Sequence, residues 1–556
     1  MPDTLAPDIR KKMNSKKNKE PLPTNRRQLL SLLAATSALL MSSTARSTPT
    51  AYKNDNLKDA NFTKNIDTLK TLDPTPARSI FVIDHTLSGD GGGGHFFWDA
   101  QSTDSADDAL VIKSNLSSTG RWHRQLQTKN LINVRWFGAV GNGITDDTES
   151  IDSALNSLDK AGGTLYFPDG NYLISKTVHL NKDNITLRGN GASRTTLTLD
   201  KDSTAEYAIY SDRSSSYKIS ELTVDVNQKN RANILGDNRR SCGIVLYNCN
   251  NSSIHNCIVK NTIGDIKNYS GVAFAIAGRS SRSTISDCSA INCGPDLTRK
   301  SDGFFISGEQ ILTSNCIADS VTDTAFVIES SRFSGLTGCT ATNCSAGAAI
   351  SHADIEHDSS GNFINGLSIN NYNATVTGAI SINIPIEIKS KTTLTNTVVS
   401  NVIITTKKGH GPAINARSVS TNNQITGLSL SNIRIKNSGT QGILAKAENL
   451  MISNCDIEDS NDASIQIDGS TQVLIQSCRA IQNNSPIAIA IIDSQKVIIK
   501  DSVIDCPPNG EWGIYCYGRE TEVISMNNII TGFKNGDIGY DSGATITAMR
   551  PSFTKI

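Results

Sequence analysis

The segment ISNCDI at residues 452–457 recurs as IQSCRA at 475–480 and as IKDSVI at 499–504. Each copy alternates apolar and polar residues, which is the pattern of a β-strand with one buried face. The cysteines of the first two copies, Cys455 and Cys478, are 23 residues apart. A short unit that returns at this period indicates a solenoid, in which each residue lies above its counterpart in the preceding coil.

The repeat extends from about residue 180 to 535, and earlier copies place a cysteine at the same position: Cys257, Cys288, Cys316 and Cys339. A leucine-rich repeat would need a helix or a Leu/Asn consensus in every unit, and neither is present. β-Branched residues and polar turns favour an all-β chain. The sequence therefore predicts a parallel β-helix.

The twelve cysteines have two possible interpretations. An even number in an exported chain is compatible with disulfides. However, six of them fall at one repeat position, which favours an inward-facing ladder of small, mostly reduced side chains. Cys506 and Cys516, near the C-terminal end, are the pair most suited to a true disulfide.

Residues 1–45 have the features of an export signal. Basic residues up to Arg26 and Arg27 precede an apolar run from Leu29 to Met41, which is shorter than the about 20 residues that span a bilayer. The adjacent arginines resemble a twin-arginine signal. We therefore expect a periplasmic or extracellular protein without stable membrane insertion after signal removal; an ordinary secretion signal and an uncleaved anchor are the alternatives.

Two further segments precede the repeat. Residues 46–76 are polar and aperiodic, which is typical of a linker. Residues 77–130 contain four glycines at 91–94 before aromatic residues, which predicts a tight turn leading into a strand. This segment resembles the small β-rich module that precedes the β-helix in phage tailspikes, which raises the possibility of a homotrimer.

Residues 131–556 form the predicted β-helix domain, which starts with a distinctive cap. Apolar residues at helical spacing follow Asp146 and Asp147, and either aspartate can accept the free N–H groups of that short helix. The strand and turn at 164–172 come next. This combination resembles the N-terminal cap of the pectate-lyase-like superfamily, which includes rhamnogalacturonases, epimerases and tailspikes. The resemblance implies a right-handed parallel β-helix that acts on polysaccharides.

Outward side chains of one sheet can form a groove for an extended sugar chain. Glycoside hydrolysis needs two carboxyls about 5–5.5 Å or about 6.5–9.5 Å apart, and neighbouring coils are about 4.8 Å apart. Asp302 and, one coil later, Asp323 resemble catalytic aspartates of polygalacturonases. The family's second aspartate is replaced by Thr324, and its histidine would fall near Ala346. The resemblance to polygalacturonases is therefore partial.

A second acidic group follows at Asp354 and Glu356, which are two residues apart and so share one face of a strand. These residues are further catalytic candidates, as acid and base or as ligands of Ca²⁺ if the protein is a lyase. Otherwise we expect no cofactor. The pair His352 and His357 lacks further zinc ligands, and no metal site is predicted.

Residues around these acids are candidates for binding substrate. Glu329 and His352 lie beside the acids, and Arg332 can neutralise a uronate carboxylate. Glu387 and Lys389 occupy the place of an Arg-Ile-Lys motif of polygalacturonases. In a lyase or epimerase, Lys389 can instead be the base that removes the C5 proton, provided that burial lowers its pKa. Lysine on a strand edge also guards against aggregation.

The sequence thus supports two classes of function. The first is an exported enzyme, related to polygalacturonases, that hydrolyses an acidic polysaccharide; a polysaccharide lyase or epimerase is the variant of this class. The second is a carbohydrate-binding or tailspike-like structural β-helix without turnover. With formal net charge zero and 19% charged residues, the composition favours neither nucleic-acid nor membrane partners.

Overall fold

A computed structural model describes residues 62–549 except for 76–78, 268–269, 353–358, 373–377, 384–391, 406–410, 419–422, 482–484 and 506–509. The expected export signal and most of the expected linker lie outside these residues. Of the helices described, none is long and apolar enough to cross a membrane.

A small module comes first in the described chain. Its sheet has the order β1-β2-β3-β5-β4, and Phe96, Ile112 and Trp122 fill its core. The strands are β1 (Phe62–Thr63), β2 (Ser79–Val82), β3 (Gly94–Asp99), β4 (Val111–Ile112) and β5 (Arg121–Arg124). As expected, the glycine run leads into β3. A Cβ on Gly93 would lie 2.1 Å from the carbonyl oxygen of Ile83, which explains why glycine is needed.

The segment 62–75, which the sequence analysis assigns to the linker, contributes to this module. Its strand β1 pairs with β2, and helix α2 (Ile66–Lys70) buries Ile66 and Leu69 in the module core. The burial of Ile66 and Leu69 thus holds a segment whose composition is otherwise polar against the module.

Helix α3 (Thr148–Ser157) forms the expected cap at the start of the β-helix, with its apolar face buried. Asp146 accepts the backbone N–H of Thr148, at 3.0 Å. Asp147 occupies the N-cap position but binds the backbone N–H groups of Val140 and Gly141 instead. The two aspartates thus fix the helix start and the preceding loop, as structural roles require.

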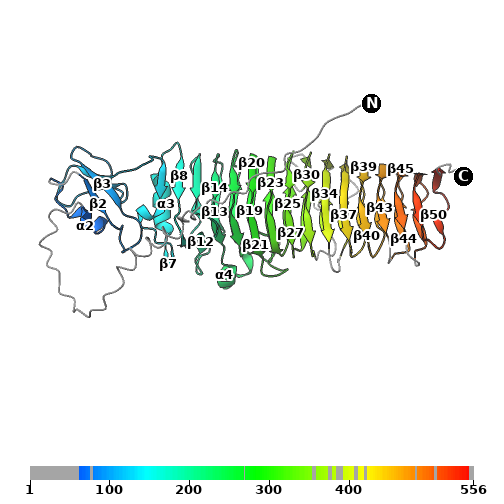
Figure 1. The fold of residues 1–556 in the computed structure, drawn as a ribbon, viewed down its shortest axis with the longest axis horizontal. Coiled ribbons are helices and arrows are strands. Elements are labelled where there is room, and N and C mark those ends of the chain that lie inside the picture. The colour runs from blue at the N-terminus through cyan, green and yellow to red at the C-terminus, as the bar shows by residue number, and fades with distance from the viewer. Residues whose placement is uncertain are drawn as a thin grey trace, which may run out of the picture. The chain divides into compact units, whose positions relative to one another are not determined.

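The rest of the described chain is a right-handed parallel β-helix whose strands stack in chain order (Figure 1). One coil contains β19 (Gly271–Ala277), β20 (Ser281–Ser286) and β21 (Ser289–Cys293), and each strand pairs in parallel with its counterpart in the next coil. The first strand of each coil belongs to a 14-stranded sheet and the others to a 32-stranded sheet, as counted over the described residues. The 32-stranded sheet runs from β6 (Leu131–Asn133) to β51 (Thr545–Met549).

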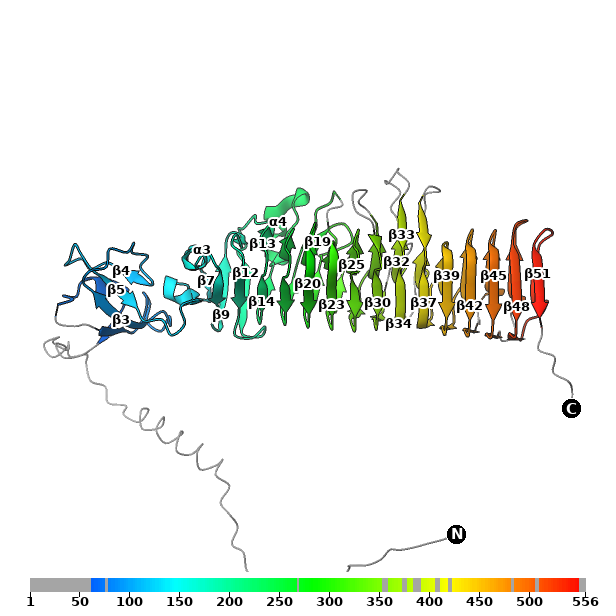
Figure 2. The same ribbon diagram turned by 90° about the horizontal axis from the view of Figure 1, so that it is seen from above.

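The 14-stranded sheet carries the candidate site. Its members, in spatial order, are β10 (Val178–His179), β13 (Tyr207–Asp212), β16 (Cys242–Tyr247), β19, β22 (Ser301–Ile306), β25 (Thr324–Glu329), β28 (Ala346–Ser351), β32 (Ile380–Asn383), β35 (Ile414–Ala416), β38 (Ile443–Ala445), β41 (Ile465–Asp468), β44 (Ile487–Ile492), β47 (Trp512–Tyr517) and β50 (Gly536–Tyr540). Helix α4 (Gln228–Leu235) projects from the stack of strands near β13 (Figure 2).

Like residues stack on like residues in the core. Phe304 lies between Phe274 and Phe326, with ring centroids 4.9 and 5.0 Å apart and nearly parallel planes. All three rings are at most 1% exposed. Every coil therefore buries its neighbours' apolar side chains as well as its own.

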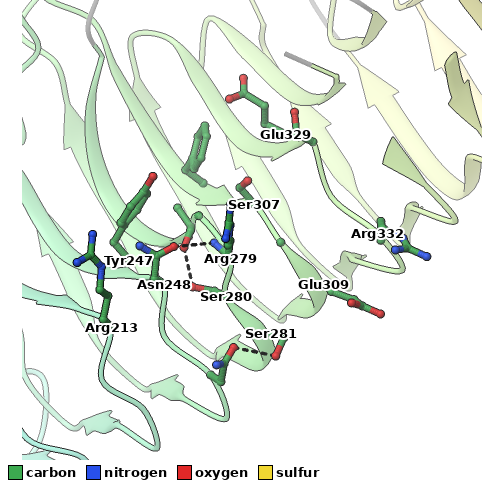
Figure 3. A pocket seen from close by; sticks show the side chains of 16 residues that line it. Arg213, Tyr247, Asn248, Arg279, Ser280, Ser281, Ser307, Glu309, Glu329 and Arg332 are labelled. Carbon is green, nitrogen blue, oxygen red and sulfur yellow. Dashed lines mark hydrogen bonds between the residues drawn. The ribbon is translucent and has the colours of Figure 1, made fainter. Parts of the chain in front are cut away.

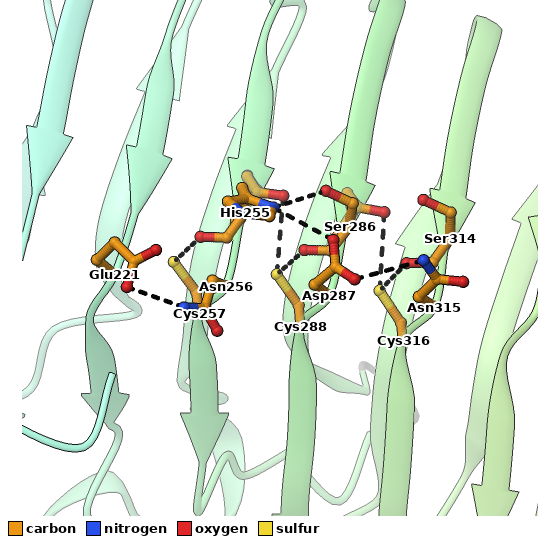
Figure 4. Close-up of polar contacts among 12 residues, drawn as sticks. Glu221, His255, Asn256, Cys257, Ser286, Asp287, Cys288, Ser314, Asn315 and Cys316 are labelled. Atoms are coloured by element: carbon orange, nitrogen blue, oxygen red, sulfur yellow. Dashed lines mark hydrogen bonds and ion pairs between the residues drawn. The ribbon is translucent and has the colours of Figure 1, made fainter. Parts of the chain in front are cut away.

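The cysteine ladder is confirmed (Figure 4). The residue before each ladder cysteine has a left-handed backbone conformation, as Asn256, Asn315 and Asn454 do with φ of 47–52°. Asparagine adopts this conformation more readily than most residues. The bend turns the next side chain inward, where the thiol of Cys288 donates to the carbonyl of Ser286 at 3.1 Å. All eleven cysteines of the described residues are buried and free. They include Cys516, contrary to the expected disulfide; its partner, Cys506, lies outside those residues.

We predict that Phe304→Ala lowers the free energy of unfolding by about 3–5 kcal/mol, because it removes one ring from a closed stack and leaves a cavity. Ile317→Ala is the control, since Ile317 is 48% exposed and its truncation is expected to change stability by less than about 1 kcal/mol. Urea titrations measure both values; equal losses in the two variants would contradict the packing described above.

We also predict that stability decreases as the pH rises above 9. Burial raises the pKa of Cys344 from 9.0 to about 11 and that of Cys293 to about 12. Between pH 9 and these values the unfolded chain loses protons that the folded chain keeps, so the free energy of unfolding falls by about 1.4 kcal/mol per pH unit for each such thiol.

The pH dependence of urea unfolding under reducing conditions, between pH 8 and 11, tests this prediction. Cys344→Ala is expected to make the slope shallower by about one thiol's contribution. An unchanged slope would show that this thiol does not ionise on unfolding in that range.

Candidate functional site

The outward face of the 14-stranded sheet has an apolar centre. Tyr210, Val245, Ala275 and Phe305 occupy the same register position on β13, β16, β19 and β22 and point away from the core. Tyr207 stacks on Tyr210 at 4.5 Å. This row crosses the strands at right angles, so that a polymer parallel to the row would contact one coil after another.

Two of the predicted acids meet where β22 and β25 begin. The carboxylate of Asp302 accepts the backbone N–H of Thr324, on the next coil, at 3.1 Å. Asp323 is one residue earlier in the chain, and its backbone N–H donates to the carbonyl of Ser301. The two aspartates therefore lie on neighbouring coils, as expected, but at adjacent rather than equivalent positions.

The two carboxyls differ in environment. Asp302 is 8% exposed, and burial, followed by the negative charges of Asp323 and Glu329, raises its pKa well above the ordinary 3.8. Asp323 is half-buried and accepts the hydroxyl of Ser270 at 2.7 Å. Burial and neighbouring carboxylates both favour the neutral form of Asp302, which can then donate a proton.

A cavity of about 1190 Å³ opens where the strands of this sheet end (Figure 3). Its lining combines outward side chains of β16, β22 and β25 with the turns that follow β13 to β25. The charged and aromatic residues of the lining are Arg213, Tyr247, Arg279, Phe305, Glu309, Glu329 and Arg332. Two predicted substrate-binding residues, Glu329 and Arg332, thus share one cavity.

Glu329 connects the cavity to the acid pair. It lines the cavity, and its charge contributes to raising the pKa of Asp302. Asp302 and Asp323 thus lie where β22 and β25 begin, and Glu329 lies at the other end of β25, from which its charge still acts on Asp302.

Other predicted residues do not join this group in the described structure. His352 is 3% exposed and does not line the cavity. Asp354, Glu356, Glu387 and Lys389 lie outside the described residues. Among the residues that are described, no three His, Cys, Asp or Glu side chains come together as they would around a metal ion.

Several residues of the cavity are not among the candidates predicted from the sequence, namely Arg213, Tyr247, Asn248, Arg279 and Glu309. Resemblance to known motifs points to carboxylates on neighbouring coils, whereas these residues lie at strand ends and in the turns between strands. Aligning each turn with the end of its preceding apolar strand would have brought Arg213 and Asn248 to one position, because Asp212 pairs with Tyr247.

Comparisons with known proteins match three parts of the chain. Residues 131–349 match the family described as rhamnogalacturonase A/epimerase, pectate lyase-like. Residues 365–549 match the right-handed β-helix region family. Residues 62–127 match the small four-stranded β-sheet domain of phage tail proteins.

Two similar proteins come from Azotobacter vinelandii. "Alginate lyase 7" is 36% identical over 110 residues, 18% of this chain and 13% of that protein. "Mannuronan C5-epimerase AlgE1" is 30% identical over 141 residues, 22% of this chain and 10% of that protein. The chain therefore matches a small part of these relatives' length.

Solved structures with a similar arrangement have low sequence identity. Bacteriophage phi29 gene product 12 gives a TM-score of 0.49 at 16% identity, over 76% of this chain and 57% of that one. The gp42 tailspike of Acinetobacter phage vb_AbaP_AS12 gives 0.46 at 12%, over 89% and 75%.

The cap, the stacked coils and the two family matches at 131–349 and 365–549 agree. The chain is therefore similar to the pectate-lyase-like family over residues 131–349 and to the right-handed β-helix region family over residues 365–549.

Proposed function

We propose that this protein is an enzyme that cleaves an anionic polysaccharide on the outward face of the 14-stranded sheet. The observation that carries the proposal is the long cavity at the ends of the strands: it extends over five coils, and its described lining includes Arg213, Arg279 and Arg332. An open, elongated cavity suits a polymer, and guanidinium groups bind carboxylates through paired hydrogen bonds.

The relatives support the substrate class. The matched proteins are named an alginate lyase and mannuronan epimerases, and these names refer to polymers of uronic acids. A uronate carboxylate carries a negative charge at neutral pH, which the arginines of the cavity would neutralise.

Hydrolysis is the reaction that the acid pair supports. Asp302, whose pKa is raised by burial and by nearby carboxylates, would donate its proton to the glycosidic oxygen as the bond to the anomeric carbon breaks. Asp323 would accept a proton from the water that adds to the anomeric carbon.

A lyase or epimerase is the second candidate, because the relatives carry those names. In a lyase, a base removes the C5 proton, the bond from C4 to the glycosidic oxygen breaks and a C4–C5 double bond forms. Asp302 would again protonate the leaving oxygen, and Lys389 is the candidate base. An epimerase would instead return a proton to the opposite face of C5.

Export, action outside the cytoplasm and assembly as a homotrimer remain predictions. Export agrees with the proposal, since polysaccharides of this kind are found outside the cell. A calcium ion at Asp354 and Glu356 is likewise a prediction that applies to the lyase.

A product assay with the purified chain tests the proposal. The chain is incubated with acidic and neutral polysaccharides, and reducing ends are measured together with the absorbance of unsaturated uronates. New reducing ends without this absorbance indicate hydrolysis, and both signals together indicate a lyase. Inversion at C5, detected by NMR, indicates an epimerase. Binding without any product would favour the non-catalytic β-helix and contradict the proposal.

We predict that Asp302→Asn lowers kcat about 10²–10⁴-fold, the usual contribution of a general acid, because the amide has no acidic proton to donate. Asp287→Asn is the matched control. Asp287 lies on the 32-stranded sheet side, at a bend where Asn256 and Asn315 hold the equivalent positions of adjacent coils. If both variants lose activity equally, Asp302 has no special role in the reaction.

We also predict that activity has an alkaline limit set by Asp302. The raised pKa of this carboxyl keeps the active, protonated form present well above pH 3.8, and activity then falls as the pH passes that raised pKa. The dependence of kcat/KM on pH measures the limit. Residual activity of Asp302→Asn is expected to lack it, and persistence of the same limit in this variant would assign it to another group.

A further inference from the structure

Strand β47, near the C-terminal end of the 14-stranded sheet, has an aromatic outward face. Its residues Ile514 and Cys516 point into the core. The other large side chains of the strand, Trp512, Tyr515 and Tyr517, point outward and are partly exposed. Ring centroids are 5.8 Å apart between Trp512 and Tyr515 and 4.6 Å apart between Tyr515 and Tyr517. The three rings therefore form one continuous row along the strand.

Two of these rings have structural partners. A Cβ on Gly539 of β50 would lie 2.6 Å from the ring of Trp512 and 2.7 Å from the ring of Tyr515, so both rings lie against this glycine. The hydroxyl of Tyr515 also donates to Asp541 at 2.9 Å. The hydroxyl of Tyr517, by contrast, makes no hydrogen bond within the part of the chain that the structure describes. The polar end of Tyr517 is therefore available to a ligand.

A second cavity, of about 340 Å³, lies beside Tyr517. Its floor includes the short outward side chains of β44, Ala490 and Ile492, and Gln466 of β41 lies on the opposite side. Gln466 pairs with Ala490 and Ala490 with Tyr515, so the aromatic wall and the amide wall are two strands, or about 10 Å, apart. The volume falls in the range of about 300–1,000 Å³ that is typical of small-molecule sites.

The amide wall is held by a hydrogen-bonded group. Nε2 of Gln441 donates to Oε1 of Gln466 at 2.9 Å and to a carboxylate oxygen of Asp462, which also lines the second cavity, at 2.7 Å. Nε2 of Gln466 makes no hydrogen bond among the described residues. This wall thus offers an amide donor and a carboxylate acceptor, both positioned by Gln441.

The second cavity differs in charge from the cavity that contains the arginines. The charged side chain in its described lining is Asp462 alone. The charges that act on the Tyr517 ring are also negative, since they belong to Asp541, Asp462 and Glu511. A uronate would be repelled here, whereas the hydroxyl groups of an uncharged sugar can both donate to the carboxylate and accept from the amide.

We propose that the second cavity binds a neutral sugar of a glycan, which gives the chain a carbohydrate-binding site apart from the proposed site of cleavage. The apolar C–H face of the sugar ring packs on Tyr517, and its hydroxyls bind Gln466 and Asp462. Strand β47 lies eight strands beyond β22 in the order of the sheet, about 38 Å at about 4.8 Å per strand, so the two sites are separate. This inference does not depend on the reaction proposed above.

Calorimetry with the full chain tests this inference. The probes are neutral hexasaccharides (cellohexaose, maltohexaose, laminarihexaose and mannohexaose), a hexamer of mannuronate and a hexamer of glucosamine, which is cationic. We expect at least one neutral probe to bind. Tyr517→Ala and Gln466→Ala are each expected to weaken this binding roughly tenfold, because a ring contact or a hydrogen bond to the sugar is lost.

Tyr540→Ala is the matched control. Tyr540 is a tyrosine of the neighbouring strand β50 that is 62% exposed and does not belong to the described lining of the second cavity, so its loss is expected to leave binding unchanged. Tyr517→Phe keeps the ring and is expected to give a smaller loss than Tyr517→Ala. Thermal unfolding checks that all variants fold.

Three outcomes would overturn the inference. The first is that none of the neutral probes binds, including the case in which the glucosamine hexamer alone does. The second is that Tyr517→Ala and Gln466→Ala bind the neutral probe as tightly as the unmodified chain. The third is that Tyr540→Ala weakens binding as much as Tyr517→Ala. The proposed cleavage is judged separately, by the product assay on acidic polymers.

Discussion

Parallel pairing between successive coils is the interaction on which the rest of this structure depends. Each strand of one coil binds the equivalent strand of the next in register, as Phe304, Phe305 and Ile306 do with Phe326, Val327 and Ile328. Because the register is preserved, side chains that point inward in one coil meet inward side chains in the next. A chain with short strands and few aromatic residues can in this way build a continuous core.

The same register creates the candidate site. Inward positions form stacks such as the phenylalanines and the cysteine ladder, while outward positions form rows across the sheet. The row from Tyr210 to Phe305 is apolar, the acids lie where the strands begin, and the arginines follow where the strands end. One repeat geometry thus positions an apolar row, a buried carboxyl and a set of cations relative to one another.

The chemistry of the acids depends on burial rather than on residue type alone. Asp302 and Asp323 are both aspartates, yet Asp302 is nearly excluded from solvent, and this burial, together with the charges of Asp323 and Glu329, raises its pKa well above the ordinary value. The half-buried Asp323 receives a hydroxyl hydrogen bond from Ser270. Different environments for two neighbouring carboxyls are what a reaction with separate acid and base roles requires.

The amino-acid sequence by itself determined the class of fold, the cap and the inward face. These features follow from local signals in the chain. The signals are the alternation of apolar and polar residues, the 23-residue spacing of Cys455 and Cys478, and the helical spacing of apolar residues after Asp147. Asp302 and Asp323 became candidates through the resemblance of their segments to polygalacturonase motifs, which is also a property of short stretches of sequence.

Only the tertiary structure decided which outward residues share a surface. Arg213 and Arg332 are separated by more than a hundred residues, and turns of different length separate their coils, so their common cavity depends on the register between strands. The raised pKa of Asp302 likewise depends on neighbours from another coil. Such contacts are set by how coils stack in space, which no single segment of the chain encodes.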